Sequence, residues 1–138
     1  MRVFLDANVL FSAAYRETGS VRTFFALAEA GACDLVTSGY AVDEARRNIR
    51  AKHPQRSADL ERLIGGVELC GEPVPGTVAW ACAQRLPSQD APKLAAAIDG
   101  RCHILVTGDR THFGVLYGRT LRGTIVMLPV DAIALLVG

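Results

Sequence analysis

Arg2-Val3-Phe4-Leu5-Asp6 is a short apolar run that ends in an acid. It lacks the polar–apolar alternation of a half-exposed strand, so it predicts a strand buried on both faces. Residues 34–38, 102–107 and 124–128 have the same character, and residues 67–70 are typical of a shorter strand. Strands of this kind belong to a parallel sheet that helices cover on both faces.

The segments between these runs have helical spacing of apolar residues. Leu94, Ala95, Ala96, Ala97 and Ile98, for example, follow a proline that suits a first helical turn. Gly71 to Gly76 holds two prolines and two glycines and is predicted to be a loop. Helices are predicted at residues 7–15, 21–30, 40–52, 57–65, 77–86, 90–99, 109–116 and from 129 onward. The alternation predicts an α/β fold, a three-layer α/β/α sandwich with a central parallel sheet.

Length and composition limit the number of domains and the class of protein. The 138 residues suit one domain, because about 150 residues per domain is usual. We therefore expect residues 1–138 to form a single domain. Hydrophobic residues make up 50% of the chain, which excludes intrinsic disorder. No apolar run approaches the roughly 18 residues of a membrane helix, so no membrane partner is expected.

Charge and cysteine content also limit the functions that the chain can have. Fifteen Lys and Arg against 14 Asp and Glu give a net charge of +1, so any electrostatic function depends on local placement. The four cysteines form no C-x-x-C pair and lie near no histidine cluster, which argues against a zinc site or a redox motif. They fit a reduced, cytoplasmic chain.

Four acids map near one edge of the predicted sheet. Asp6 ends the first strand, and Asp109 follows the strand at 102–107 by two residues. Asp90 opens the helix before that strand, and Glu44 lies one turn into the helix after residues 34–38. Ligands of open parallel sheets bind beyond the carboxyl ends of the strands.

Each acid also has a simpler explanation. Asp6, Asp90 and Asp109 could be helix N-caps, and Glu44 could be a solvated helix residue. The four together favour a divalent-cation site, because neighbouring carboxylates repel one another unless a cation neutralises them. Mg²⁺ or Mn²⁺ suits such a set of oxygen ligands.

These segments resemble the PIN-domain ribonucleases, including the VapC-type toxins of toxin–antitoxin pairs. The matching segments, in the family's order, are residues 3–10, 37–44, 90–97 and 105–109. The resemblance implies that Asp6, Glu44, Asp90 and Asp109 bind the metal and carry the catalysis, with Asn8 and Thr107 in support. It implies a metal-dependent endoribonuclease with an RNA substrate, an antitoxin protein as partner, and a homodimer.

Two positions depart from the family's pattern. Ala7 stands where many members have a hydroxyl residue, and Thr111 stands where many have a further acid. Both changes leave the four main acids intact, but they leave open whether one or two metal ions bind.

Basic residues near the acids could bind RNA. Arg46, Arg47 and Arg50 follow Glu44 on the same predicted helix, and Lys93 and Arg110 lie close in sequence to the acids. These five are the candidates for contact with the phosphate backbone. The alternative is an ordinary solvated face with cations near a helix C-terminus.

The histidines and other motifs offer little competing chemistry. His112 lies three residues beyond Asp109 and could face the site, while His103 begins a strand and is expected to be structural. No glycine-rich phosphate loop follows a strand, which argues against a nucleotide-binding domain. The remaining alternative to a nuclease is a non-catalytic PIN-like module that binds RNA or protein.

Overall fold

A six-stranded sheet forms the centre of the computed structural model, which describes residues 1–138. Its strand order is β3-β2-β1-β4-β6-β5. The five parallel strands are β1 (Arg2–Leu5), β2 (Asp34–Ser38), β3 (Glu68–Cys70), β4 (Ile104–Val106) and β6 (Thr124–Met127). The predicted α/β fold with a central parallel sheet is confirmed.

The sixth strand, β5 (Thr120–Leu121), was not predicted, and it runs antiparallel to β6 at one edge. Arg122 and Gly123 join the two strands, with φ angles of 50° and 91°. Two central residues with positive φ are the mark of a tight hairpin turn, which usually has Asn or Asp before the glycine. Arg122 stands where Asn or Asp is usual, so the sequence does not predict this hairpin.

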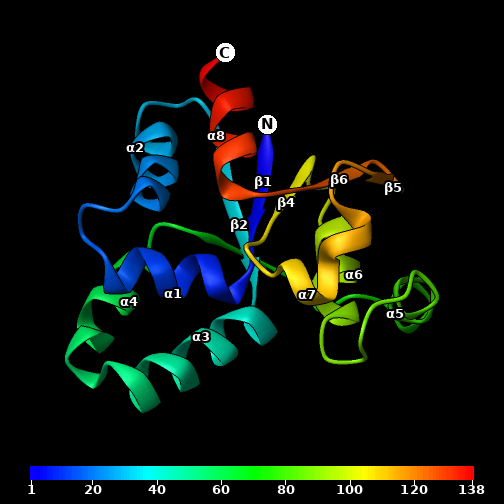
Figure 1. Ribbon diagram of the computed structural model, residues 1–138, viewed down its shortest axis with the longest axis horizontal. Coiled ribbons are helices and arrows are strands. Elements are labelled where there is room, and N and C mark those ends of the chain that lie inside the picture. The colour runs from blue at the N-terminus through cyan, green and yellow to red at the C-terminus, as the bar shows by residue number, and fades with distance from the viewer.

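Helices cover both faces of the sheet (Figure 1). In that view α2 and α6 lie on opposite sides of the strands; α2 packs on β2, and α6 packs on β2 and β4. The α-helices are α1 (Ala7–Tyr15), α2 (Thr23–Glu29), α3 (Gly39–Lys52), α4 (Ser57–Ile64), α5 (Pro75–Cys82), α6 (Ala91–Asp99), α7 (Arg110–Phe113) and α8 (Pro129–Val137). This arrangement gives the three layers that the alternation predicts.

One helix was placed wrongly along the chain. Helix α5 begins at Pro75 and ends at Cys82, whereas the sequence predicts a loop to residue 76 and a helix over 77–86. Pro75 is the first helical residue, where a missing N–H costs nothing. The prediction of a loop was wrong because Pro75 begins a helix and does not interrupt one.

The three apolar residues of the first strand are buried completely. Val3, Phe4 and Leu5 have no exposed surface, and α1 follows directly after Asp6. All four cysteines are free thiols, as expected. No helix in the structure has the length and apolar character that crossing a membrane requires.

Candidate metal centre

The two central strands bring distant parts of the chain together at one edge of the sheet. Leu5 of β1 is in register with Val106 of β4, and the Asp6 N–H donates to the Val106 carbonyl at 3.0 Å. Asp6 and Thr107, the next residues of the two segments, therefore lie side by side. From β1 the chain builds β2 and β3 on one side, while β4 lies on the other. Such a change of direction opens a crevice at the carboxyl ends of the strands.

Asp6 is held in place by neighbours on both strands. Its Oδ1 accepts the Ala7 N–H at 2.7 Å, and its Oδ2 accepts the Thr107 hydroxyl at 2.8 Å and the Asn8 amide at 3.1 Å. The Asn8 Oδ1 accepts the Gly108 N–H at 2.8 Å, which ties α1 to the loop after β4. The structure thus brings Asn8 and Thr107 into direct contact with Asp6.

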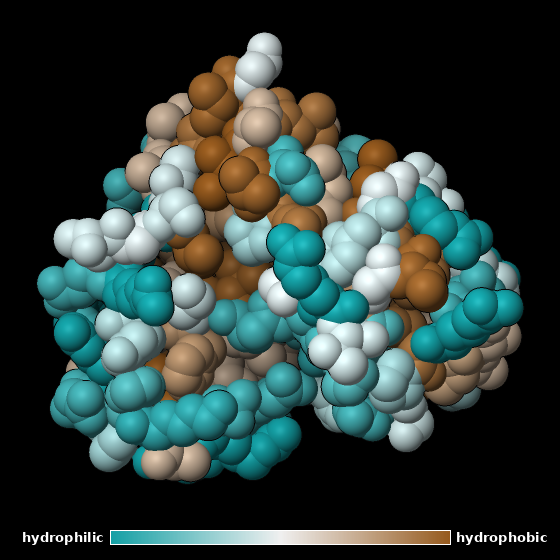
Figure 2. All heavy atoms as spheres, in the orientation of Figure 1, coloured by the Kyte–Doolittle hydropathy of each residue, from teal (hydrophilic) through white to brown (hydrophobic).

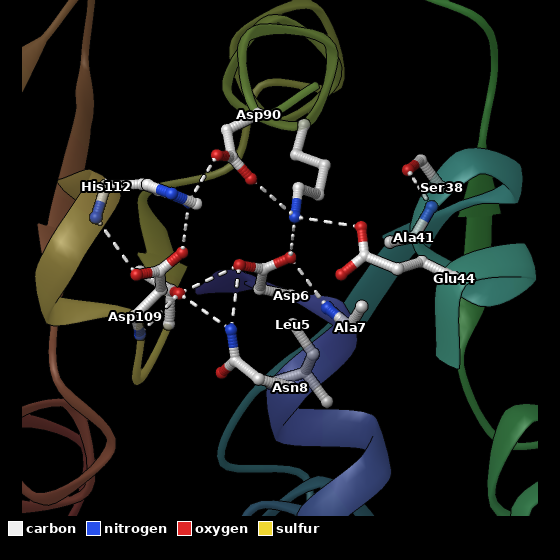
Figure 3. Close-up of polar contacts among 12 residues, drawn as sticks. Leu5, Asp6, Ala7, Asn8, Ser38, Ala41, Glu44, Asp90, Asp109 and His112 are labelled. Carbon is white, nitrogen blue, oxygen red and sulfur yellow. Dashed lines mark hydrogen bonds and ion pairs between the residues drawn. The ribbon is translucent and has the colours of Figure 1, made fainter. Parts of the chain in front are cut away.

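Three of the four acids meet at a single cation, the ammonium of Lys93 (Figure 3). Its Nζ lies 3.0 Å from Asp6 Oδ1, 3.0 Å from Asp90 Oδ1 and 3.3 Å from Glu44 Oε1. The three carboxylates come from the end of β1, the start of α6 and the middle of α3. Their convergence defines a buried position for positive charge.

Lys93 is charged despite its burial. Only 3% of its side chain is exposed. Burial alone lowers the pKa of Lys93, but the nearby carboxylates of Asp6, Asp90 and Glu44 outweigh burial and raise the pKa above its ordinary value. The ammonium neutralises acids that would otherwise repel one another.

The fourth acid, Asp109, pairs with His112. Asp109 caps α7 by accepting the His112 N–H at 3.0 Å, and its Oδ2 lies 2.9 Å from His112 Nδ1. The same ring nitrogen lies 2.9 Å from Asp90 Oδ2. His112 therefore bridges Asp90 and Asp109, and the structure brings all four predicted acids into one cluster.

Helix capping explains two of the acids but not all. Asp6 and Asp109 each cap a helix with a side-chain hydrogen bond, whereas Asp90 makes no capping bond. Asp90 Oδ2 is buried and has no hydrogen-bond partner. Its 2.9 Å contact with His112 Nδ1 is an ion-pair contact and not a hydrogen bond. A native buried carboxylate oxygen in this state points to an interaction beyond capping.

Two residues at the site have roles that the sequence analysis missed. Lys93 was predicted to reach RNA but faces the carboxylates instead, and its place three residues after Asp90 on one helix was the available signal. The Tyr117 hydroxyl donates to the carbonyls of Thr107 and Asp109 at 2.8 and 3.1 Å, and thereby holds the loop after β4. Burial raises the pKa of Tyr117 to about 12, so this donor keeps its proton near neutral pH. No local pattern in the sequence marks Tyr117.

A groove of about 380 Å³ leads from solvent to the acids. Asn8, Ser12, Glu44 and Asp109 are among the residues that line it. Glu44 is 30% exposed and Asp109 25%, while Asp6 is fully buried beneath them. A ligand in this groove would meet Glu44 and Asp109 first.

The predicted RNA contacts differ in their surroundings. Arg46 is tied to Glu61 at 2.7 Å and to Asp43 at 3.8 Å. Its hydrogen bond to Glu61 raises the pKa of the Arg46 guanidinium. The remaining three arginines of the prediction are exposed: Arg47, Arg50 and Arg110. Figure 2 shows charged and polar side chains along α3 and apolar ones gathered over α8.

The chemistry of the cluster fits a divalent ion. Carboxylate oxygens are the ligands that Mg²⁺ and Mn²⁺ prefer, and one of those oxygens, on Asp90, is buried without a hydrogen bond. Asp90, Asp109 and His112 place one ligand atom each within 4.8 Å of one another. The cluster can therefore supply both oxygen and nitrogen ligands.

Comparison with known proteins gives one family and a set of similar folds. A family model described as "PIN domain" matches residues 2–111, which include all four acids. No curated protein matches the sequence.

The solved structures similar to this chain are distant in sequence. VapBC2 from Rickettsia felis, bound to a DNA fragment from its promoter, is 15% identical, with 93% of this chain and 98% of that chain covered and a TM-score of 0.72. PAE2754 from Pyrobaculum aerophilum is 17% identical, with 99% and 96% covered and a TM-score of 0.67. FitAcB from Neisseria gonorrhoeae is 19% identical, with 93% and 98% covered and a TM-score of 0.61. At these identities the likeness supports the fold.

Proposed function

The chain belongs to the PIN-domain family, and from this premise we propose that it is a metal-dependent endoribonuclease that hydrolyses RNA phosphodiester bonds. The observation that carries the proposal is the convergence of Asp6, Glu44 and Asp90 on one buried cation. Three carboxylates held within about 3 Å of one positive charge form a site that a divalent ion can use.

Four acids would hold Mg²⁺ or Mn²⁺ in this proposal: Asp6, Glu44, Asp90 and Asp109. A bound divalent ion polarises a phosphodiester oxygen and lowers the pKa of an attacking water. Thr107 and Asn8 orient Asp6 through hydrogen bonds, so that its carboxylate cannot rotate away. The buried floor of the site at Asp6 excludes bulk water, which strengthens the electrostatic interactions there.

RNA would approach along the groove lined by Glu44 and Asp109. The exposed arginines Arg47, Arg50 and Arg110 are proposed to contact its phosphates, since Lys93 is buried among the acids and Arg46 is already paired. Only 7% of the residues are aromatic, so recognition would depend on the backbone more than on base stacking.

We also propose that the enzyme is the toxin of a toxin–antitoxin pair. The name of VapBC2, one of the structures with a similar fold, matches the VapC-type toxins that the sequence resembles. Val130, Leu135 and Val137 of α8 are exposed apolar residues that suit a protein partner, either an antitoxin or a second copy of the chain.

The test is cleavage of total RNA by the purified protein with Mn²⁺ or Mg²⁺ and with a chelator. The variant Asp6→Asn keeps the size and the helix-capping oxygen but removes a charge from the site. We expect its cleavage rate to fall about 100-fold or more, because even the outer partners of metal ligands are worth roughly 10- to 100-fold. The control is Asp131→Asn, which changes an exposed acid on α8 and should cleave normally.

A second function follows from the same contacts. Lys93 already neutralises three acids, so the cluster could serve as a structural ion network in a non-catalytic module that binds RNA or protein. In that case the wild type binds RNA without cutting it. Cleavage that survives in folded Asp6→Asn would overturn the role of Asp6.

A further inference from the structure

A second cation position lies beside the one that Lys93 fills. One ligand atom from each of Asp90, Asp109 and His112 lies within 4.8 Å of the other two. His112 Nδ1 is 2.9 Å from Asp90 Oδ2 and 2.9 Å from Asp109 Oδ2. Figure 3 shows the two carboxylates turned toward the imidazole ring.

We infer that His112 binds the divalent ion through its ring nitrogen, together with Asp90 and Asp109, in a mixed nitrogen–oxygen site. This inference rests on the proposed function, since it specifies the metal site of the proposed nuclease. The family match ends at residue 111, so it does not include His112.

The unpartnered oxygen of Asp90 is the first support. Asp90 is 3% exposed, and its two oxygens differ in their surroundings. Oδ1 lies against the Lys93 ammonium, whereas Oδ2 is buried without a hydrogen bond and faces His112. Burial of a carboxylate oxygen without a hydrogen bond is costly, and a bound ion removes that cost.

The spacing of the atoms is the second support. Two ligand atoms that lie at right angles around an ion, each about 2.1 Å from it, are about 3.0 Å apart. Both contacts of His112 Nδ1 have this length. The three residues are thus already spaced as neighbouring ligands, and the ion needs no large rearrangement of the chain.

The arrangement divides the cluster into two positions that share Asp90. Lys93 lies among Asp6, Glu44 and Asp90 Oδ1, while the second position lies between Asp90 Oδ2, Asp109 and His112. An ion can therefore enter the second position while Lys93 keeps the first, and Asp6 and Glu44 join Asp90 and Asp109 around the metal when the ammonium turns aside. The His112 side chain is 38% exposed, which gives the ion a route from solvent.

A nitrogen ligand changes which ion binds best. Carboxylate oxygens bind both Mg²⁺ and Mn²⁺, whereas an imidazole nitrogen suits first-row transition ions, the series that Mn²⁺ begins. The chain should therefore bind Mn²⁺ more tightly than Mg²⁺, and His112 should be the source of that preference.

The experiment is pulsed electron paramagnetic resonance of Mn²⁺ bound to the full chain, combined with Mn²⁺ and Mg²⁺ binding isotherms. The wild type is compared with His112→Gln, and His103→Gln is the matched control because His103 is exposed and precedes β4, at the end of the strand opposite to the site. We expect imidazole-nitrogen modulation of the Mn²⁺ signal in the wild type and in His103→Gln. In His112→Gln the modulation should vanish, and Mn²⁺ affinity should fall about 10-fold or more while Mg²⁺ affinity changes little.

Each outcome decides a different point. The inference is overturned if Mn²⁺ binds to the wild type without nitrogen modulation, or if the modulation persists in His112→Gln. If the protein still cleaves RNA in either case, the proposed function stands. A wild-type chain that binds no Mn²⁺ and cleaves no RNA would overturn both. Circular dichroism of each variant shows that the loss is not due to unfolding.

Discussion

Asp6 combines two roles that its position in the sequence leaves as alternatives, a helix cap and a ligand of a cation. Its Oδ1 caps α1 through the Ala7 N–H and also contacts Lys93 Nζ. Its Oδ2 accepts from Thr107 and Asn8. A helix cap fixes the carboxylate at the strand end, and a fixed carboxylate is what a cation site needs. The capping interpretation therefore does not compete with the metal interpretation at this residue.

Lys93 is the residue on which the stability of the cluster depends in the absence of metal. Replacing it in Lys93→Met leaves Asp6 and Asp90 buried without a countercharge, and removal of one partner from a buried ion pair costs about 3–5 kcal/mol. We expect denaturant unfolding in a chelator to show a loss of this order. Mn²⁺ should restore most of it, because the ion takes over the role of the ammonium.

The control for this variant is Arg47→Met, which removes an exposed cation from α3 and should change the free energy of unfolding little. A Lys93→Met protein as stable as the wild type in chelator would contradict the assignment of Lys93 as the internal countercharge.

The four acids were predictable from the sequence, and the contacts among them were not. Strand ends at Asp6 and Asp109 follow from apolar runs, and parallel strands carry such ends to the same edge. The direction of a long side chain such as Lys93 is decided by burial and by partners from β1 and α3, which sequence spacing does not show. The same holds for Tyr117, whose hydroxyl reaches back across the loop to Thr107.

The helices and strands also differ in whether the local sequence predicts them or they depend on contacts with distant parts of the chain. Helix α6 was placed correctly because Asp90, Pro92 and Gly100 mark its start and end within one continuous apolar segment. Strand β5 was missed because two residues carry no periodic pattern, and it forms only by pairing with β6 through the Arg122-Gly123 turn. Helix α5 was shifted because prolines mark both loops and helix starts.

The distribution of cysteines over the whole molecule gives a prediction about accessibility. Burial raises the pKa of Cys102 to about 12 and also raises the pKa values of Cys33 and Cys70. Cys82 is exposed at the end of α5. Because the thiolate is the reactive form, a thiol reagent at pH 8 should label one residue rapidly, Cys82, and all four only after unfolding.

Mass spectrometry of the labelled protein identifies the site, and the variant Cys82→Ser should lose the rapid phase. Rapid labelling of Cys33 or Cys102 in the folded chain would contradict the packing described above.

The net charge of +1 conceals two opposed local features of the molecule. Acids gather at the carboxyl edge of β1 and β4, and exposed arginines lie on the neighbouring α3. Asp90 is the acid that belongs to both cation positions, since its two oxygens face Lys93 and His112.

The decisive measurement is therefore the rate of RNA cleavage as a function of free Mn²⁺ for the wild type and for Asp90→Asn, with Asp131→Asn as the control. The wild type and the control should show no cleavage in chelator and a rate that rises to saturation with Mn²⁺. Folded Asp90→Asn should show no Mn²⁺-dependent rate. Cleavage by the wild type in chelator, or wild-type rates in Asp90→Asn, would contradict a metal-dependent nuclease centred on this cluster.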